Sequence, residues 1–144
     1  MLKFKQQMEE FMKYLELAGT VILDENKKIL LMHRNTKNLT QWELPGGKLE
    51  PKEMPEQTAQ RELKEELNIN IEIKRYLGFK EFEDNEYILK YHWFLCKLGD
   101  EEPKLMEKKF DKLSYFSKTE LEDKRNELSS NMKALIHTIN IENL

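Results

Sequence analysis

The sequence predicts a single α/β domain whose central sheet is covered on both faces. Its 144 residues are long enough to bury a core without disulfides or other staples. The segment Trp93–Cys96 is apolar at every position, as in a strand buried on both faces. Ala59, Leu63 and Leu67 repeat every four residues, as on the buried side of a helix. These patterns indicate a central strand and a helix that contribute to one core.

Apolar residues at helical spacing occur near the beginning of the chain. They recur at intervals of four, three, one and three residues, which predicts an amphipathic helix over about 3–16. Its apolar side is expected to cover the domain, although it could also bind a partner or form a homodimer contact. The apolar residues are Phe4, Met8, Phe11, Met12 and Leu15.

Two apolar runs, 17–23 and 29–32, flank a turn-rich segment and predict a hairpin of two strands. Residues 33–38 are polar and basic, so we expect a loop. Arg34 in this loop would lie beside the glycine turn described next, where it could contact a phosphate or a base or remain solvated. His33 is assigned no role.

Trp42–Pro45 is expected to be a strand that leads into a loop at Gly46–Gly47. Proline stops strand pairing, and glycines allow a ligand to approach the backbone closely. The next helix should begin at Pro55, a residue favoured at the first helical position, and end near Leu67. Asn68 can adopt the left-handed conformation that terminates helices.

The second half of the chain predicts further strands. Residues 69–82 alternate unevenly, residues 87–97 are strongly β-like, and 84–86 is the turn between them. A charged loop over 99–109 precedes a last strand at 113–116.

Two helices are expected at the end of the chain. Ser117 and Glu120 form a capping box for a short helix, and Ser129 or Ser130 can cap the final one. The final helix would bury an apolar stripe of Met132, Leu135, Ile136 and Ile139.

Composition limits the kinds of partner and compartment. A net charge of −3 provides no broad positive field, so a nucleic-acid partner is disfavoured. The single Cys96 lies in an apolar run, which favours a core residue in a reducing compartment. No stretch approaches the roughly 18 apolar residues of a membrane span, and the N-terminus is too charged for a signal peptide. We therefore expect a cytoplasmic protein without a membrane partner.

Three carboxylates crowd one face of the central helix. Glu62, Glu65 and Glu66 are three and four residues apart, which places neighbouring Cβ atoms about 5–6 Å from one another. Such a cluster is either a solvated acidic face or a site for a cation that neutralises it. An all-oxygen site is what Mg²⁺ or Mn²⁺ prefers.

Three further features favour a cation. Glu53 lies in the loop before the helix and can turn back towards the same face. Arg61 can hold a carboxylate in a fixed orientation through a bidentate pair. The glycine turn supplies exposed backbone groups at the same end. Together these features predict a metal site.

The segment Gly47–Ile69 resembles the signature of the Nudix hydrolases, G-x5-E-x7-R-E-U-x-E-E-x-G-U, in which U is aliphatic. Asn68 stands where the family has Gly, and Asn is among the non-glycine residues best able to adopt that conformation. The residues from Trp42 to Gly46 and the order of the elements are also similar to the family. The resemblance implies one Nudix domain over 1–144, an α/β/α sandwich with a mixed β-sheet between helices.

The resemblance also implies hydrolysis of a nucleoside diphosphate linked to another moiety, with Mg²⁺ or Mn²⁺ as cofactor. Glu65 and Glu66 would be the principal metal ligands, and the Gly46 carbonyl a further one. Glu62 would be a ligand or the general base that activates water.

Other positions would complete the site. By the same resemblance, Arg61 and Glu53 would support the loop and the helix. We also expect Gly47 and Lys48, at the glycine turn, to contact the substrate. Glu107 resembles a family glutamate that approaches the metals from a loop, although Glu101, Glu102 and Asp111 lie nearby and the loop could simply be solvated.

The substrate is less clearly indicated than the reaction. The runs WELPGGKLE and PEQTAQRELKEEL resemble the MutT-type branch, which releases pyrophosphate from oxidised or non-standard nucleoside triphosphates. In that branch an Asn at the start of the final helix reads the base, and Asn131 is similarly placed, although it could simply be a first-turn residue. Tyr87 has the spacing of dinucleoside polyphosphate hydrolases, but a core position explains it better.

Three alternatives stay open. An ADP-sugar such as ADP-ribose is another common substrate class, although the proline expected downstream is absent. A module that binds nucleotides without turnover would keep the same acidic cluster. A hydrolase of capped RNA should have a basic groove, which the net charge of −3 disfavours.

Overall fold

The computed structural model describes residues 13–144. Most of the helix predicted over 3–16 therefore lies outside the described residues. Its last four positions, 13–16, are the beginning of strand β1 (Lys13–Ile22), so the prediction is wrong there. Leu15 pairs with Leu89 of a distant strand, and this tertiary pairing outweighs the local helical spacing.

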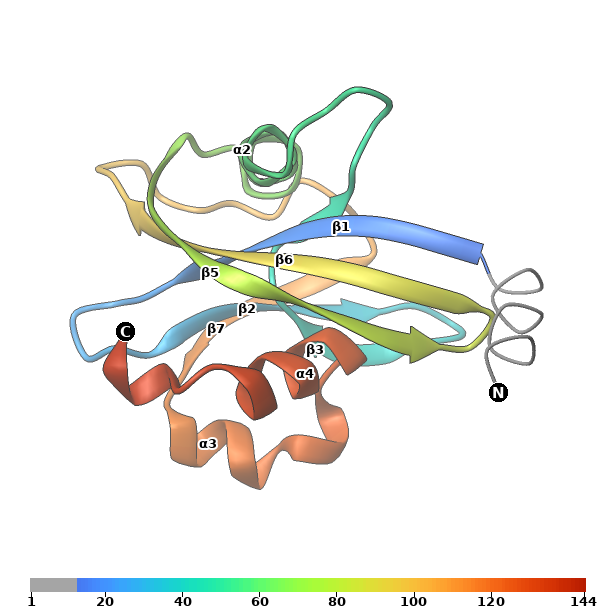
Figure 1. The fold of residues 1–144 in the computed structure, drawn as a ribbon. Coiled ribbons are helices and arrows are strands. Elements are labelled where there is room, and N and C mark those ends of the chain that lie inside the picture. Colours follow the sequence, from blue (N-terminus) through green and yellow to red (C-terminus); the bar gives the residue numbers. More distant parts are fainter. Residues whose placement is uncertain (1–12) are drawn as a thin grey trace.

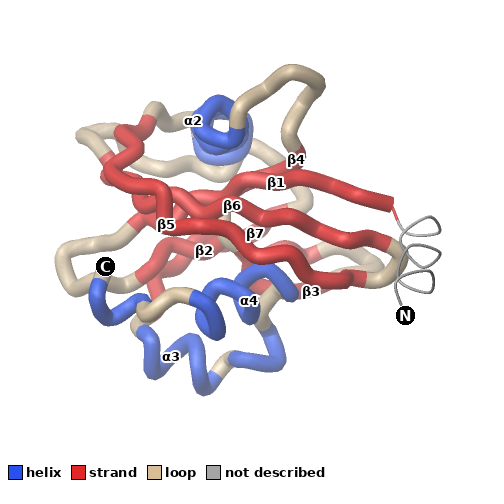
Figure 2. Tube along the Cα trace, viewed as in Figure 1, coloured by secondary structure: helices blue, strands red, loops and turns tan. Residues whose placement is uncertain are grey.

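The strands described within 13–144 form two sheets (Figures 1 and 2). The larger sheet has the order β4-β1-β6-β5 and is mixed, because β1 and β6 are parallel while the other neighbours are antiparallel. The smaller sheet has the order β3-β2-β7 and is antiparallel. The remaining strands are β2 (Ile29–Asn35), β3 (Thr40–Glu43), β4 (Gly46–Lys48), β5 (Ile71–Asp84), β6 (Tyr87–Leu98) and β7 (Phe110–Phe116).

Strand β6 lies between β1 and β5, which confirms the prediction of a central strand. Trp93 and Phe94, which point to opposite faces, are both fully buried. Cys96 is also buried, as expected for a core residue. Tyr87 differs from the expectation: it is only half-buried at the first position of the strand, where Lys13 Nζ lies 5.9 Å from its ring centroid.

The predicted hairpin between residues 17 and 32 does not form. β1 pairs with β4 and β6, whereas β2 pairs with β3 and β7 in the other sheet, and only an isolated bridge joins Leu23 to Ile29. The turn itself is present, since the Asp24 carboxylate accepts from the backbone N–H groups of Asn26 and Lys28. The chain uses this turn to pass from one sheet to the other.

Two predicted loop segments contain strand residues: Gly46 and Gly47 begin β4, and three residues of the loop predicted over 33–38 belong to β2. Residues 33–35 extend β2, and the backbone N–H of Asn35 donates to the Lys109 carbonyl. Strand β7 begins at Phe110 rather than at residue 113, because it pairs with this extended end of β2. Arg34 is therefore in a strand and not in a loop.

Helix α2 (Pro55–Leu67) has the predicted bounds. Asn68 has φ 56° and ψ 37°, which is the left-handed conformation, and its N–H donates to the Lys64 carbonyl. The stripe of Ala59, Leu63 and Leu67 is fully buried. Asn68 thus ends the helix in the conformation expected at this position.

The C-terminal helices are α3 (Lys118–Asp123) and α4 (Ser130–Thr138), with short 3₁₀ turns η1 (Arg125–Glu127) and η2 (Ile141–Asn143). The capping box of Ser117 and Glu120 is present at α3. Ser129, rather than Ser130, caps α4, since its Oγ accepts from the N–H of Met132.

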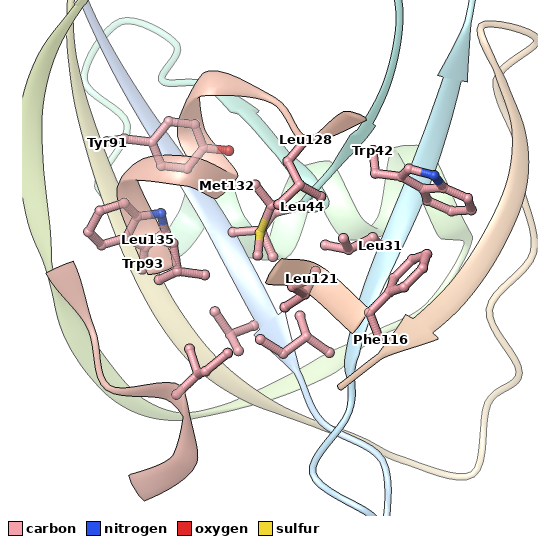
Figure 3. Close-up of a cluster of buried hydrophobic side chains, with 13 residues drawn as sticks. Leu31, Trp42, Leu44, Tyr91, Trp93, Phe116, Leu121, Leu128, Met132 and Leu135 are labelled. Carbon is pink, nitrogen blue, oxygen red and sulfur yellow. The ribbon is translucent and has the colours of Figure 1, made fainter. Parts of the chain in front are cut away.

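Helix α2 covers one side of the sheets and α3 and α4 lie on the other (Figure 1). One core packs the buried side of α2 against Ala18, Ile22 and Phe94. The other packs α3 and α4 against the opposite strand faces and includes Trp93 and Leu135 (Figure 3). The α/β/α architecture is confirmed, with two sheets in the middle layer instead of one. Within residues 13–144, no helix has the length and apolar character needed to cross a bilayer.

Candidate active site

Arg61 is the centre of the acidic cluster on α2. Its Nε and Nη2 donate to the two oxygens of Glu53 at 2.7 and 2.9 Å, which is a bidentate pair. Nη2 also donates to the Lys48 carbonyl at 2.9 Å. Nη1 donates to Glu62 Oε1 at 2.9 Å and to Glu65 Oε2 at 3.2 Å. One guanidinium therefore joins the glycine turn, the following loop and two carboxylates of the helix.

Glu53 is held by more than Arg61. Its carboxylate also accepts from the Thr58 hydroxyl and from the backbone N–H of Glu50. The hydrogen bond from Arg61, more than any other contact, lowers the pKa of Glu53 to about 2. Glu53 is consequently ionised at neutral pH and fixed to the start of the helix.

The two glycines of the turn are required by close contacts. A Cβ atom on Gly47 would lie 2.5 Å from Cδ of Glu62, and one on Gly46 would lie 2.3 Å from the Ala18 carbonyl oxygen. Without side chains, the turn packs directly against the helix and β1. The N–H of Gly46 also donates to Glu66 Oε1 at 2.9 Å.

Glu66 is a buried carboxylate with a side chain that faces other acids. It is 3% exposed, and burial, followed by the nearby charge of Glu62, raises its pKa to about 9. Burial also raises the pKa of Glu62. A cation placed beside these two groups would stabilise their charged forms, because it would oppose both the desolvation and the repulsion.

The donors present fit a hard divalent cation in kind and charge. Glu62, Glu65 and Glu66 offer carboxylate oxygens, and Gly46 adds a backbone carbonyl. Among residues 13–144, no three His, Cys, Asp or Glu side chains are already gathered closely enough to enclose a metal. Glu62 Oε1 and Glu65 Oε2 accept from Arg61, which leaves the second oxygen of each carboxylate for a cation.

Glu107 approaches the same cluster from the loop before β7. The N–H groups of Lys104 and Met106 donate to the carbonyls of Leu67 and Glu66, which docks this loop on the end of α2. The charge of Glu107 contributes to the raised pKa values of Glu62 and Glu66. The loop thus brings a further acid within electrostatic reach of the helix.

A cleft of about 390 Å³ extends from the carboxylates to the start of α4. The structure brings seven of the predicted site residues to it, whereas Glu53, Arg61, Glu65 and Glu107 do not line it. The predicted residues that line it are Arg34, Gly46, Gly47, Lys48, Glu62, Glu66 and Asn131.

Arg34 is already paired within the cleft. It forms a bidentate contact with Glu43, in which Nη2 donates to Oε1 at 3.0 Å, and its guanidinium carbon lies 4.9 Å from the ring centroid of Phe110. The hydrogen bond to Glu43 raises the pKa of Arg34. The guanidinium is therefore rigidly placed, and part of its charge is neutralised.

Several cleft residues were not identified from the sequence. Glu43 lies three residues before Gly46 and Lys109 is the last residue of the charged loop, but neither belongs to the signature. Tyr91 lies beside the turn, and a Cβ on Gly46 would be 2.8 Å from its hydroxyl. The alternation of β6 could have identified it, because Tyr91 and Trp93 lie on the same face of that strand.

Comparison with known proteins identifies the family and agrees with the fold. Residues 13–138 match the model of the NUDIX domain. The chain belongs to the Nudix family. The crystal structure of a MutT Nudix hydrolase from Burkholderia pseudomallei superimposes with a TM-score of 0.75 at 25% identity and covers 89% of this chain and 99% of that one. The Nudix fold is therefore shared over nearly the whole molecule.

Named relatives share shorter segments with this Nudix chain. The 8-oxo-dGTP diphosphatase of Proteus vulgaris is 43% identical over 61 residues, which are 41% of this chain and 54% of the relative. The CTP pyrophosphohydrolase of Escherichia coli (strain K12) is 35% identical over 83 residues, which are 56% of this chain and 61% of the relative. The chain spans about half the length of the curated relatives it matches.

Proposed function

We propose that this Nudix chain hydrolyses a nucleoside triphosphate to the monophosphate and pyrophosphate with Mg²⁺ as cofactor, Mn²⁺ being able to replace it. The observation that carries the proposal is the composition of the cleft. Glu62, Glu66 and the glycine turn line it together with Asn131 and the apolar Leu17 and Leu89. A diphosphate with its cation suits the carboxylates, and a base, with its apolar ring faces and polar edge, suits the leucines and Asn131.

The names of the relatives support the same substrate class. One is an 8-oxo-dGTP diphosphatase, one a CTP pyrophosphohydrolase, and the similar structure is a MutT Nudix hydrolase. These proteins differ in the base that they are named for. The relatives therefore support a nucleoside triphosphate without indicating which base it carries.

Each site residue has a role that its position allows. Glu65, Glu66 and the Gly46 carbonyl would hold the cation, which when bound would act as a Lewis acid towards the phosphates. Glu62 would accept the proton of the attacking water, because burial raises its pKa towards that of a useful base. Arg61 and Glu53 fix the helix and the turn relative to each other.

The remaining residues would handle the substrate. Lys48 and Arg34 provide positive charge along the cleft for the phosphates, and Gly47 permits their approach to the backbone. Glu107 would add a carboxylate to the cation from the docked loop. The phosphate groups would thus be surrounded by residues from α2, the turn and the small sheet.

The first test replaces the proposed ligands. Glu65→Gln and Glu66→Gln should each lower turnover by orders of magnitude, because a neutral amide binds Mg²⁺ weakly. Pyrophosphate release is measured at saturating Mg²⁺, with Glu72→Gln on the exposed side of β5 as the control for loss of one charge. Near-normal rates in both variants would exclude this metal assignment.

Product analysis separates the proposed reaction from its alternatives. The chain is incubated with nucleoside triphosphates, dinucleoside polyphosphates and ADP-sugars, and the products are identified. Pyrophosphate from a triphosphate supports the proposal, whereas AMP from an ADP-sugar assigns the other substrate class. Tight nucleotide binding without any product would indicate a binding module.

A further inference from the structure

The side chain of Asn131 is held by a buried tryptophan. Nε1 of Trp93 donates to Oδ1 of Asn131 at 2.9 Å. Trp93 is fully buried in β6, and Asn131 is 9% exposed in the first turn of α4. Figure 3 shows Trp93 beside Leu135 of the same helix, in the core between β6 and α4. The contact therefore connects the central strand to a residue that lines the cleft.

This hydrogen bond determines which end of the Asn131 amide faces away from the core. An indole N–H can donate but cannot accept, so its partner must be the amide oxygen and not the amide nitrogen. The NH₂ group of Asn131 consequently points away from Trp93. An Asn side chain free to turn over could present either a donor or an acceptor, but this one presents a donor.

The NH₂ group is accessible from the cleft. Across residues 13–144, Asn131 Nδ2 has no hydrogen-bond partner, and every fully buried side-chain nitrogen or oxygen in that range has one. Nδ2 is therefore not fully buried, and Asn131 lines the cleft. Two donor hydrogens are thus available to a ligand beside the start of α4.

We infer that Trp93 is a positioning residue that sets the base preference by locking Asn131 as a donor. The inference rests on the proposed binding of a nucleotide in this cleft. A base carbonyl accepts from the NH₂ group, whereas an exocyclic amine would bring two donors together. The cleft should favour bases with a carbonyl at the contacted position over those with an amine there.

The start of α4 strengthens this preference. Ser129 Oγ accepts from the N–H of Met132, but the first N–H groups of a helix have no partners within it. Ser130 and Asn131 supply such groups where they line the cleft. Backbone and side chain at this end are both donors, which suits an acceptor on the ligand.

The experiment compares bases that differ by one exchange of carbonyl for amine. The values of kcat/KM are measured for ITP against ATP and for UTP against CTP. In the unchanged protein we expect the carbonyl member of at least one pair to be favoured by about tenfold or more, the cost of one mismatched buried hydrogen bond. Equal values in both pairs would overturn the inference.

Two variants test the role of Trp93 itself. Trp93→Phe keeps an aromatic ring but removes the donor, so Asn131 can turn over and the ratio should fall towards one. Asn131→Asp keeps an acceptor for the indole and presents a second acceptor to the base, so the preference should reverse towards ATP or CTP. A purely structural tryptophan would lower both kcat/KM values equally and leave their ratio unchanged.

Control experiments distinguish a loss of folding from a change in base preference. Trp42→Phe alters the other tryptophan of the same core, which does not line the cleft, and should leave the ratio as it was. If Trp93→Phe fails to fold, Asn131→Asp still tests whether residue 131 acts as a donor: a reversed base preference supports the inference and an unchanged preference overturns it. If no triphosphate is turned over, the proposed function fails, and calorimetric binding of IMP against AMP still tests the inference: tighter IMP binding supports it and equal binding overturns it.

Discussion

Glu53 and Glu66 lie in opposite electrostatic environments although both belong to the same candidate site. Glu53 accepts from Arg61, Thr58 and the backbone, which favours its charged form. Glu66 is buried beside Glu62 with one backbone donor, which favours its neutral form. The first can support the structure without a cation, whereas the second needs a cation to be charged at neutral pH.

The close contact between Gly47 and the Glu62 carboxylate leads to a prediction about a single methyl group. A methyl group at Gly47 would displace the Glu62 carboxylate, which is the end of a side chain and can move. Gly47→Ala should therefore abolish most activity while lowering the free energy of unfolding by about 1 kcal/mol or less. Steady-state assays and urea unfolding measure the two effects.

Gly46→Ala is the matched comparison. Its methyl group would meet the Ala18 carbonyl and the Gly19 backbone, which cannot move without distorting β1. This variant should lose stability as well as activity. Similar stability losses in the two alanine variants would contradict the distinction between side-chain and backbone contacts.

The residues of the signature could be assigned from the sequence because they are spaced along one helix and its preceding loop. Arg61, Glu62 and Glu65 are neighbours in any α-helix, so local geometry brings them together. The bond between Trp93 and Asn131 joins residues 38 positions apart, which no local spacing reveals. Its detection requires the packing of α4 against β6.

At the scale of elements, the loop over residues 49–54 is fastened to α2 by Glu53. The pKa of this carboxyl is about 2 in the folded protein, below its ordinary value of 4.5. Such a group stabilises the folded state above pH 4.5, and the stabilisation is lost as the pH falls towards 2. The contact should therefore weaken only in acid.

Glu53→Gln tests this pH dependence. At pH 7 the variant should unfold with a free energy lower by about 1–3 kcal/mol, because charge-assisted hydrogen bonds are lost. The difference from the unchanged protein should shrink as the pH falls from 5 to 2. Urea unfolding over this range measures it, and Glu72→Gln should show no comparable trend.

Element boundaries were predictable where local signals set them. Pro55, Asn68 and the Ser117 cap determine helix ends through their own backbones and side chains, and these ends are as expected. The pairing of strands was not, because the turn at Asp24 resembles that of a hairpin. The strands on either side of this turn pair with β6 and β7, which are distant in sequence. The stabilisation from those pairings cannot be predicted from neighbouring residues alone.

At the scale of the molecule, two separate cores stabilise the fold from opposite sides of the sheets. Leu63 belongs to the core under α2 and Leu135 to the core under α4, and both are fully buried. Leu63→Ala and Leu135→Ala should each cost about 2–5 kcal/mol of unfolding free energy. Their effects should add to within about 0.5 kcal/mol in the double variant, because they share no contacts.

Chemical denaturation of the two single variants and the double variant measures the additivity. A coupling well above that margin would show that the cores communicate through the sheets. The presence of two cores was only partly predictable from the sequence. The apolar strand over 93–96 indicated that the sheet is covered on both faces, but not that the middle layer consists of two sheets.

The cleft is lined by different parts of the chain: the glycine turn and α2 supply its carboxylates, and β6 and α4 supply Tyr91 and Asn131. Under the proposed function, a few substitutions near residues 91–93 and 129–131 could therefore change the preferred base without changing the residues proposed to cleave the diphosphate. Relatives named for such different bases as 8-oxoguanine and cytosine illustrate the range that such changes can reach.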